Sequence, residues 1–209
     1  MLSRLIALAA FIFLSACGAD HKWASDAEVA SARYVQGPPA TITLITSING
    51  RDGSGAHSGL LINGAERVLY DPAGSWELVN GGAPERADLH YGMTPGVLSS
   101  YLKFQSYGVF RIVVQTVEVP QAVADQAIAE AIKAGAAPKA DCSHSISNIL
   151  NNLPGFESIP NTFFPKALSR GMAKIPGVRE QDFEEFELLE DVSLTGASSN
   201  SSSAAPATN

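Results

Sequence analysis

The positions of the two cysteines limit how this chain can be held together. Cys17 ends a short apolar leader, and Cys142 stands alone in the second half of the sequence. A cut before Cys17 would remove 16 of the 209 residues and leave 193. A chain of that length suits one domain with its own hydrophobic core. With Cys17 occupied by lipid, the exported protein would keep one thiol and no disulfide, and an unpaired thiol is a candidate reactive group.

The leader has the features of an export signal. Arg4 supplies a positive charge, an apolar run follows, and small residues precede Cys17. The run is shorter than the roughly 20 apolar residues that span a bilayer. The segment Leu14-Ser15-Ala16-Cys17 resembles a bacterial lipobox, which implies cleavage before Cys17 and lipidation of its sulfur. More than one acyl chain would anchor the protein stably. The alternative is an ordinary secretory signal that happens to contain a cysteine.

The resemblance to a lipobox also implies a location. The protein would be anchored by lipid to a bacterial membrane and face the periplasm. Gly18 rather than aspartate follows the cysteine, a pattern that favours the outer membrane in enterobacteria-like sorting.

The rest of the chain is acidic. The whole sequence has 14 Lys and Arg against 21 Asp and Glu, a net charge of −7, and losing Arg4 with the leader would make it −8. Such a surface disfavours binding to nucleic acid or to anionic lipid head groups. No nucleic-acid partner is expected. No segment after Cys17 is a candidate membrane span.

Composition divides the sequence into four parts. They are a signal peptide (1–16), a lipidated tether (17–39), a folded domain (40–192) and a Ser- and Ala-rich tail (193–209) expected to be disordered. We expect an α+β fold with a mixed or antiparallel sheet. Strands are predicted at 41–48, 57–62, 67–71 and 110–119, with a last extended segment near 184–188. Helices are predicted at 26–34, 94–107, 121–134, 142–152 and 163–174, and residues 75–91 are expected to be irregular.

Cys142 is the first candidate for chemistry. Asp141 is a good N-cap residue, which would place Cys142 in the first turn of a helix. The free N–H groups and the helix dipole there stabilise a thiolate, and the same N–H groups can bind an oxyanion. The alternative is that Cys142 is a small, inert core residue. The local sequence leaves both open.

His57 and Asp71 are the second and third candidates. The two strands that they bracket are joined by a turn at Asn63-Gly64, which predicts a hairpin. The start of one strand then lies beside the end of the next, so His57 and Asp71 would be near neighbours. Histidine is the usual base for activating a cysteine, and an acid can fix its tautomer. The alternatives are a polar residue at a strand end and a turn-starting Asp-Pro.

The order His57, Asp71, Cys142 resembles a known family. It is similar to the circularly permuted branch of the NlpC-type papain-like superfamily, which includes the lecithin:retinol acyltransferase-like proteins. The resemblance covers roughly residues 41–152, and Asp71 stands where that branch more often has His, Asn or Gln. It implies a papain-like permuted domain in which a His-bearing hairpin packs against a Cys-bearing helix. It also implies a substrate that is a cell-wall peptide or a lipid-derived acyl group.

Other constellations are weaker. His90 and His144 can be combined with His57 and Cys142 as zinc ligands, but their spacing matches no compact zinc motif. His144 is two residues from Cys142, and such helix neighbours do not face each other. The sequence contains no phosphate-binding glycine loop and no GxSxG segment. No cofactor is therefore expected.

The sequence supports one main hypothesis and two rivals. The main hypothesis is an envelope lipoprotein that acts as a cysteine hydrolase or acyltransferase on an amide or ester. The rivals are a non-catalytic binding lipoprotein on the same fold and a structural envelope protein. The distance between the Cys142 sulfur and the His57 ring separates them best.

Overall fold

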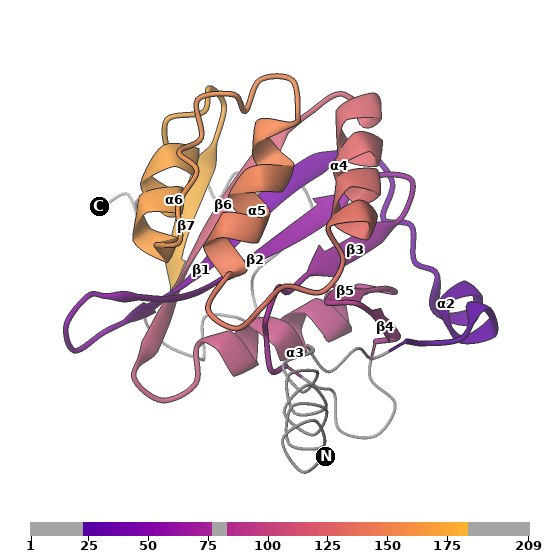
Figure 1. Cartoon of the computed structure of the whole chain (residues 1–209). Coiled ribbons are helices and arrows are strands. Elements are labelled where there is room, and N and C mark those ends of the chain that lie inside the picture. The colour runs from indigo at the N-terminus through magenta and orange to yellow at the C-terminus, as the bar shows by residue number, and fades with distance from the viewer. Residues whose placement is uncertain (1–22, 77–82, 184–209) are drawn as a thin grey trace, which may run out of the picture.

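A computed structural model of the chain describes residues 23–76 and 83–183. This part is an α+β fold, with five helices and an open seven-stranded antiparallel sheet (Figure 1). The helices are α2 (Asp26–Ala32), α3 (Pro95–Gln105), α4 (Gln121–Ala134), α5 (Cys142–Asn151) and α6 (Pro165–Met172). The strands are β1 (Thr41–Asn49), β2 (Gly55–Asn63), β3 (Arg67–Tyr70), β4 (Glu85–Arg86), β5 (Leu89–His90), β6 (Phe110–Glu118) and β7 (Arg179–Phe183). Their order in the sheet is β4-β5-β3-β2-β1-β6-β7.

The alternation of side chains along β1 explains how the sheet is covered. Ile42 and Leu44 point to one face, where they join the core under α4, α5 and α6. Ile45 points to the other face and packs with residues of α3. Because both faces are covered, the central strands are apolar on both sides, which their density of branched residues reflects. Figure 1 shows α5 lying across the sheet over β2.

The predicted helices and central strands are confirmed. The helix 121–134 has the bounds expected, and the others differ from expectation by at most two residues at each end. The Thr94 side chain accepts a hydrogen bond from the Val97 N–H and so caps α3. The hairpin of β2 and β3 has the predicted turn, and β6 is an interior strand between β1 and β7.

One expectation about strands is wrong, and one strand was not predicted. The stretch 75–91 is not irregular throughout, because β4 and β5 pair with each other and β5 pairs with β3. With two residues each, these strands carry no alternation that a sequence can reveal. A further strand, β7, precedes the expected extended segment. Its side chains are exposed except Phe183, so it lacks an apolar pattern. The segment 184–188 itself lies outside the described residues, as do the leader and the tail 193–209.

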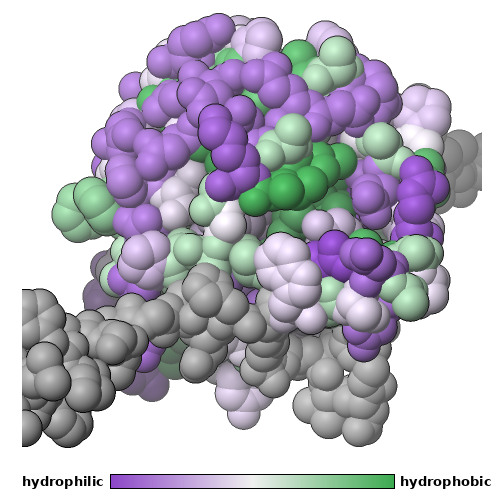
Figure 2. Space-filling view, turned by 45° about the vertical axis from the view of Figure 1, so that its right-hand side comes forward, coloured by the Kyte–Doolittle hydropathy of each residue, from purple (hydrophilic) through white to green (hydrophobic). Residues whose placement is uncertain are grey.

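The surface is polar on the side that Figure 2 shows. The face turned forward in Figure 2 is mostly hydrophilic, with a smaller hydrophobic area near its centre. Within residues 23–76 and 83–183, no helix is long and apolar enough to cross a membrane.

Candidate functional site

Cys142 is the first residue of α5 and is almost fully buried, with 7% of its surface exposed. The helix packs against β2, where the hydroxyls of Ser58 and Ser143 lie 3.2 Å apart. The prediction that Cys142 stands in the first turn of a helix is confirmed. Its sulfur lies 3.8 Å from the Ser143 hydroxyl. The cysteine is therefore held between the helix and the strand that carries His57.

Asp141 occupies the N-cap position but does not act as expected there. Its carboxylate makes no cap hydrogen bond to the α5 backbone. It instead accepts a hydrogen bond from the Ser145 hydroxyl at 2.9 Å and lies 3.1 Å from Nδ1 of His144. Both side chains lie further along α5, and they take the place of the backbone N–H groups that the carboxylate would otherwise cap. The N–H groups of the first turn consequently remain uncapped by this side chain.

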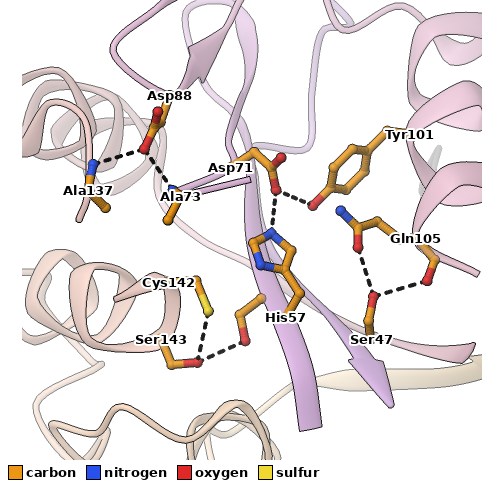
Figure 3. Close-up of polar contacts among 11 residues, drawn as sticks. Ser47, His57, Asp71, Ala73, Asp88, Tyr101, Gln105, Ala137, Cys142 and Ser143 are labelled. Carbon is orange, nitrogen blue, oxygen red and sulfur yellow. Dashed lines mark hydrogen bonds and ion pairs between the residues drawn. The ribbon is translucent and has the colours of Figure 1, made fainter. Parts of the chain in front are cut away.

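His57 and Asp71 meet as the hairpin predicts. Nε2 of His57 lies 2.6 Å from Oδ1 of Asp71. The Asp71 side chain is 1% exposed and that of His57 is 19% exposed. A charged or polarised pair that is so little solvated interacts more strongly than the same pair in water. Figure 3 shows His57 between Asp71 and the end of α5 that carries Cys142.

The strand register explains the contact. Leu60 pairs with Tyr70, so Asp71 continues β3 opposite Gly59 of β2. His57 is two residues before Gly59 and therefore points to the same face of the hairpin as a diagonal neighbour of Asp71. Because Gly59 has no side chain, the hydroxyl of Tyr101 can lie against the strand here. A Cβ at residue 59 would lie 2.2 Å from that hydroxyl.

Tyr101 is a site residue that the sequence did not reveal. It lies on α3, is fully buried and donates a hydrogen bond from its hydroxyl to Oδ1 of Asp71 at 2.8 Å. The polar contacts continue behind it, where the Ser47 hydroxyl donates to Oε1 of Gln105 at 2.9 Å (Figure 3). A tyrosine at an apolar position of an amphipathic helix is typical of a core residue. Only the contact with Asp71 distinguishes it.

The surroundings of His57 and Cys142 favour their charged forms. Burial alone would lower the pKa of the His57 ring, but hydrogen bonding and charge attraction from Asp71 and Cys142 raise that pKa to about 10. Burial alone would raise the pKa of the Cys142 thiol. Hydrogen bonding and charge attraction from His57, with help from the Ser58 backbone and Ser143, instead lower that pKa. Both shifts favour the ion pair of a thiolate and an imidazolium over the neutral thiol and imidazole.

Asp88 connects the two loops that bring the site together. Its Oδ2 accepts hydrogen bonds from the N–H groups of Ala73 and Ala137, each at 2.8 Å (Figure 3). Ala73 follows Asp71, and Ala137 lies in the loop between α4 and α5. The Asp88 carbonyl also accepts a hydrogen bond from the Asp71 N–H at 2.8 Å. The loop after β3 and the loop before Cys142 are therefore tied to one side chain.

The other two histidines of the described residues, His90 and His144, pack against aromatic rings. His90 packs edge-on against Trp76, with ring centroids 4.9 Å apart. His144 stacks on Phe163, with centroids 4.4 Å apart, and contacts Asp141. In the described part of the chain, no group of three His, Cys, Asp or Glu side chains could hold a metal ion.

Comparison with protein-family models, with curated proteins and with solved structures found no match for this chain. The structure brings Cys142, His57 and Asp71 together from a helix, a strand and a loop. It adds Tyr101 and Asp88 to them. Cys17 lies outside the described residues.

Proposed function

We propose that the protein is a cysteine hydrolase or acyltransferase that acts on an amide or ester. The observation that carries the proposal is the 2.6 Å contact between His57 and the buried Asp71 carboxylate, with Cys142 at a helix N-terminus beside them. A histidine oriented by an acid and coupled to a thiol is the arrangement that activates a cysteine nucleophile.

The acylation step follows from the charges of the pair. The Cys142 thiolate attacks the carbonyl carbon, and a carbon–sulfur bond forms. The N–H groups of the first turn of α5 stabilise the negative charge on the carbonyl oxygen. The imidazolium of His57 then donates its proton to the leaving alcohol or amine as the bond to that group breaks.

The second step restores the thiolate. Water, or an alcohol or amine acceptor, loses a proton to neutral His57 and attacks the thioester. The carbon–sulfur bond breaks, and the Cys142 thiolate and the His57 imidazolium are regenerated. Asp71 holds the ring through Nε2, which leaves Nδ1 for the sulfur and the substrate.

The order of these residues along the chain supports a relation to the permuted NlpC-type papain-like proteins, with a helix-borne cysteine that follows the histidine hairpin. That relation suggests cell-wall peptides or lipid-derived acyl groups as substrates. Membrane attachment through lipid on Cys17, at the outer membrane and facing the periplasm, belongs to the same proposal. A buried Cys142 far from His57 would favour the rival of a non-catalytic binding lipoprotein. Cys142 is buried, but His57 lies beside the end of α5 that carries it, which counts against that rival.

The test is the pH dependence of Cys142 alkylation by iodoacetamide, with peptide mapping to identify the modified residue. The wild-type chain in detergent should react at neutral pH because His57 lowers the pKa of the thiol. In His57→Ala the thiolate should form only at more alkaline pH, since burial then acts without the imidazolium. Each unit of that shift reduces the rate at pH 7 about tenfold.

The pH dependence of turnover should also have an upper limit. The value of kcat/KM should fall as pH rises through about 10, where His57 loses the proton that the leaving group needs. His144→Ala is the matched control, because that histidine contacts Asp141 and Phe163 instead. An unchanged alkylation profile in His57→Ala would show that the two residues are not coupled and would overturn the proposal.

A further inference from the structure

A pocket of about 360 Å³ opens on one side of His57, between β2, α3 and β6. His57 and Ala56 form part of its wall on β2. Phe104, Tyr107 and Phe110 line it as well, and Phe104 and Tyr107 are 45% and 79% exposed. Large apolar side chains held at the surface beside a reactive group mark a binding site for an apolar group.

The walls of the pocket select against charge. Among the described residues that line it, none is Asp, Glu, Lys or Arg, and His57 is the basic group at its edge. Two of the polar walls already bond to each other, because the Ser47 hydroxyl donates to both oxygens of Gln105, side chain and backbone. A charged group placed against the apolar walls, away from His57, would lose its water without gaining an ion-pair partner, which costs free energy. The pocket therefore suits an uncharged, largely apolar group.

The position of the pocket beside His57 indicates which part of the substrate, the acyl group or the leaving group, it binds. Cys142 does not line the pocket, although His57 does. In acyl transfer the acyl carbon bonds to sulfur, whereas the leaving group receives its proton from the histidine. The atom that leaves must therefore lie next to the ring, and its substituent extends into the space beyond the ring.

We propose that this pocket binds the leaving-group side of the substrate, an uncharged alcohol or amine with an apolar substituent. This inference rests on the proposed function. During acylation the bond from the carbonyl carbon to the leaving oxygen or nitrogen breaks, and the electron pair stays with that atom. The atom takes the proton of the His57 imidazolium and departs as a neutral alcohol or an amine. The reverse path makes the same pocket the site of an apolar acceptor in acyl transfer.

Two matched ester series test the inference on the full chain in detergent. One series keeps an acetyl group and lengthens the alcohol from ethyl to butyl and hexyl, and the other keeps ethanol and lengthens the acid in the same way. The primary alcohols leave with similar ease, so differences report binding. We expect kcat/KM to rise about fourfold for each CH2 added to the alcohol, from the free energy of burying that group. The acyl series should not depend on the pocket.

Variants show where the selectivity arises. Ala56→Phe fills the pocket, and Phe104→Ala with Tyr107→Ala removes its apolar walls, so both should abolish the preference for long alcohols. Phe164→Ala removes another strongly exposed aromatic side chain that does not line the pocket, and it should keep the preference. Iodoacetamide alkylation of Cys142, measured in every variant, reports whether the pair with His57 is intact.

The outcomes separate the inference from the proposed function. Chain-length selectivity in the acyl series that is lost in Ala56→Phe would overturn the inference, because the pocket would then hold the acyl group. Equal selectivity in Ala56→Phe and wild type would also overturn it. If no ester is turned over and alkylation does not depend on His57, the proposed function fails and the inference fails with it. If alkylation depends on His57 but no ester reacts, the inference alone is overturned.

Discussion

Tyr101 and His57 share one oxygen of the Asp71 carboxylate, at 2.8 and 2.6 Å. The tyrosine is fully buried, does not line the pocket and donates its hydroxyl proton to Asp71, so it acts through Asp71 as a positioning residue. Two donors on one oxygen fix the direction of the carboxylate, and thereby the plane of the histidine ring. A hydrogen bond to a charged group contributes about 1.5–3 kcal/mol.

Tyr101→Phe should therefore change the chemistry as well as the stability. We expect the alkylation profile of Cys142 to shift toward alkaline pH, because a less well oriented His57 stabilises the thiolate less. Tyr70→Phe is the matched control, since it also removes the hydroxyl of a buried tyrosine, one that donates to the Gly135 carbonyl. Urea unfolding and alkylation against pH measure the two effects. Equal profiles in Tyr101→Phe and wild type would assign Tyr101 a purely structural role.

At the scale of residues, the sequence predicts His57, Asp71 and Cys142 because each depends on local structure. A hairpin turn sets the register of the first two, and a helix start sets the third. Tyr101 depends instead on how α3 packs against the sheet from a separate part of the chain. Its identity as an apolar helix residue carries no sign of the carboxylate that it meets.

At the scale of elements, Asp88 joins the loop after β3 to the loop before α5. Its φ of 66° lies in the left-handed region, which Asn and Asp tolerate better than most residues. Asp88→Ala should leave the N–H groups of Ala73 and Ala137 without their acceptor. Each loss costs about 1–3 kcal/mol, so the free energy of unfolding should fall by about 2 kcal/mol or more.

Asp88→Asn is the matched control, because it keeps a side-chain oxygen and tolerates the same backbone conformation. We expect it to be less destabilised than Asp88→Ala in urea unfolding. Hydrogen exchange at the Ala73 and Ala137 amides should accelerate in Asp88→Ala before global unfolding. If exchange at both amides is unchanged, Asp88 does not hold these loops.

Some elements of the fold can be predicted from the sequence and others cannot. The long helices and the strands β1, β2 and β6 can be predicted, because apolar residues repeat along them with a regular period. β4, β5 and β7 do not, since they are two-residue or exposed strands whose pairing depends on a neighbouring edge. The Asp88 bridge joins segments that are distant in sequence and leaves no local pattern.

At the scale of the whole molecule, the distribution of apolar residues predicts the α+β class, and the structure confirms it. The order of the strands could not be predicted, because alternation indicates a strand but not its neighbour. β1 pairs with both β2 and β6, although α3 separates β6 from the hairpin in sequence. This arrangement places α3, and with it Tyr101 and the pocket walls, under the end of β2 that carries His57.

The anchor is a property of the whole chain and is tested on it. Expressed in bacteria, the full-length protein should incorporate labelled palmitate and partition into detergent, because more than one acyl chain binds a membrane stably. Cys17→Ala should abolish both. Cys142→Ala is the matched control, since it removes the other cysteine and should keep the label. Label that persists in Cys17→Ala would contradict lipidation at that residue. A protein exported without lipid would then bring the same His57–Cys142 pair to substrates in solution.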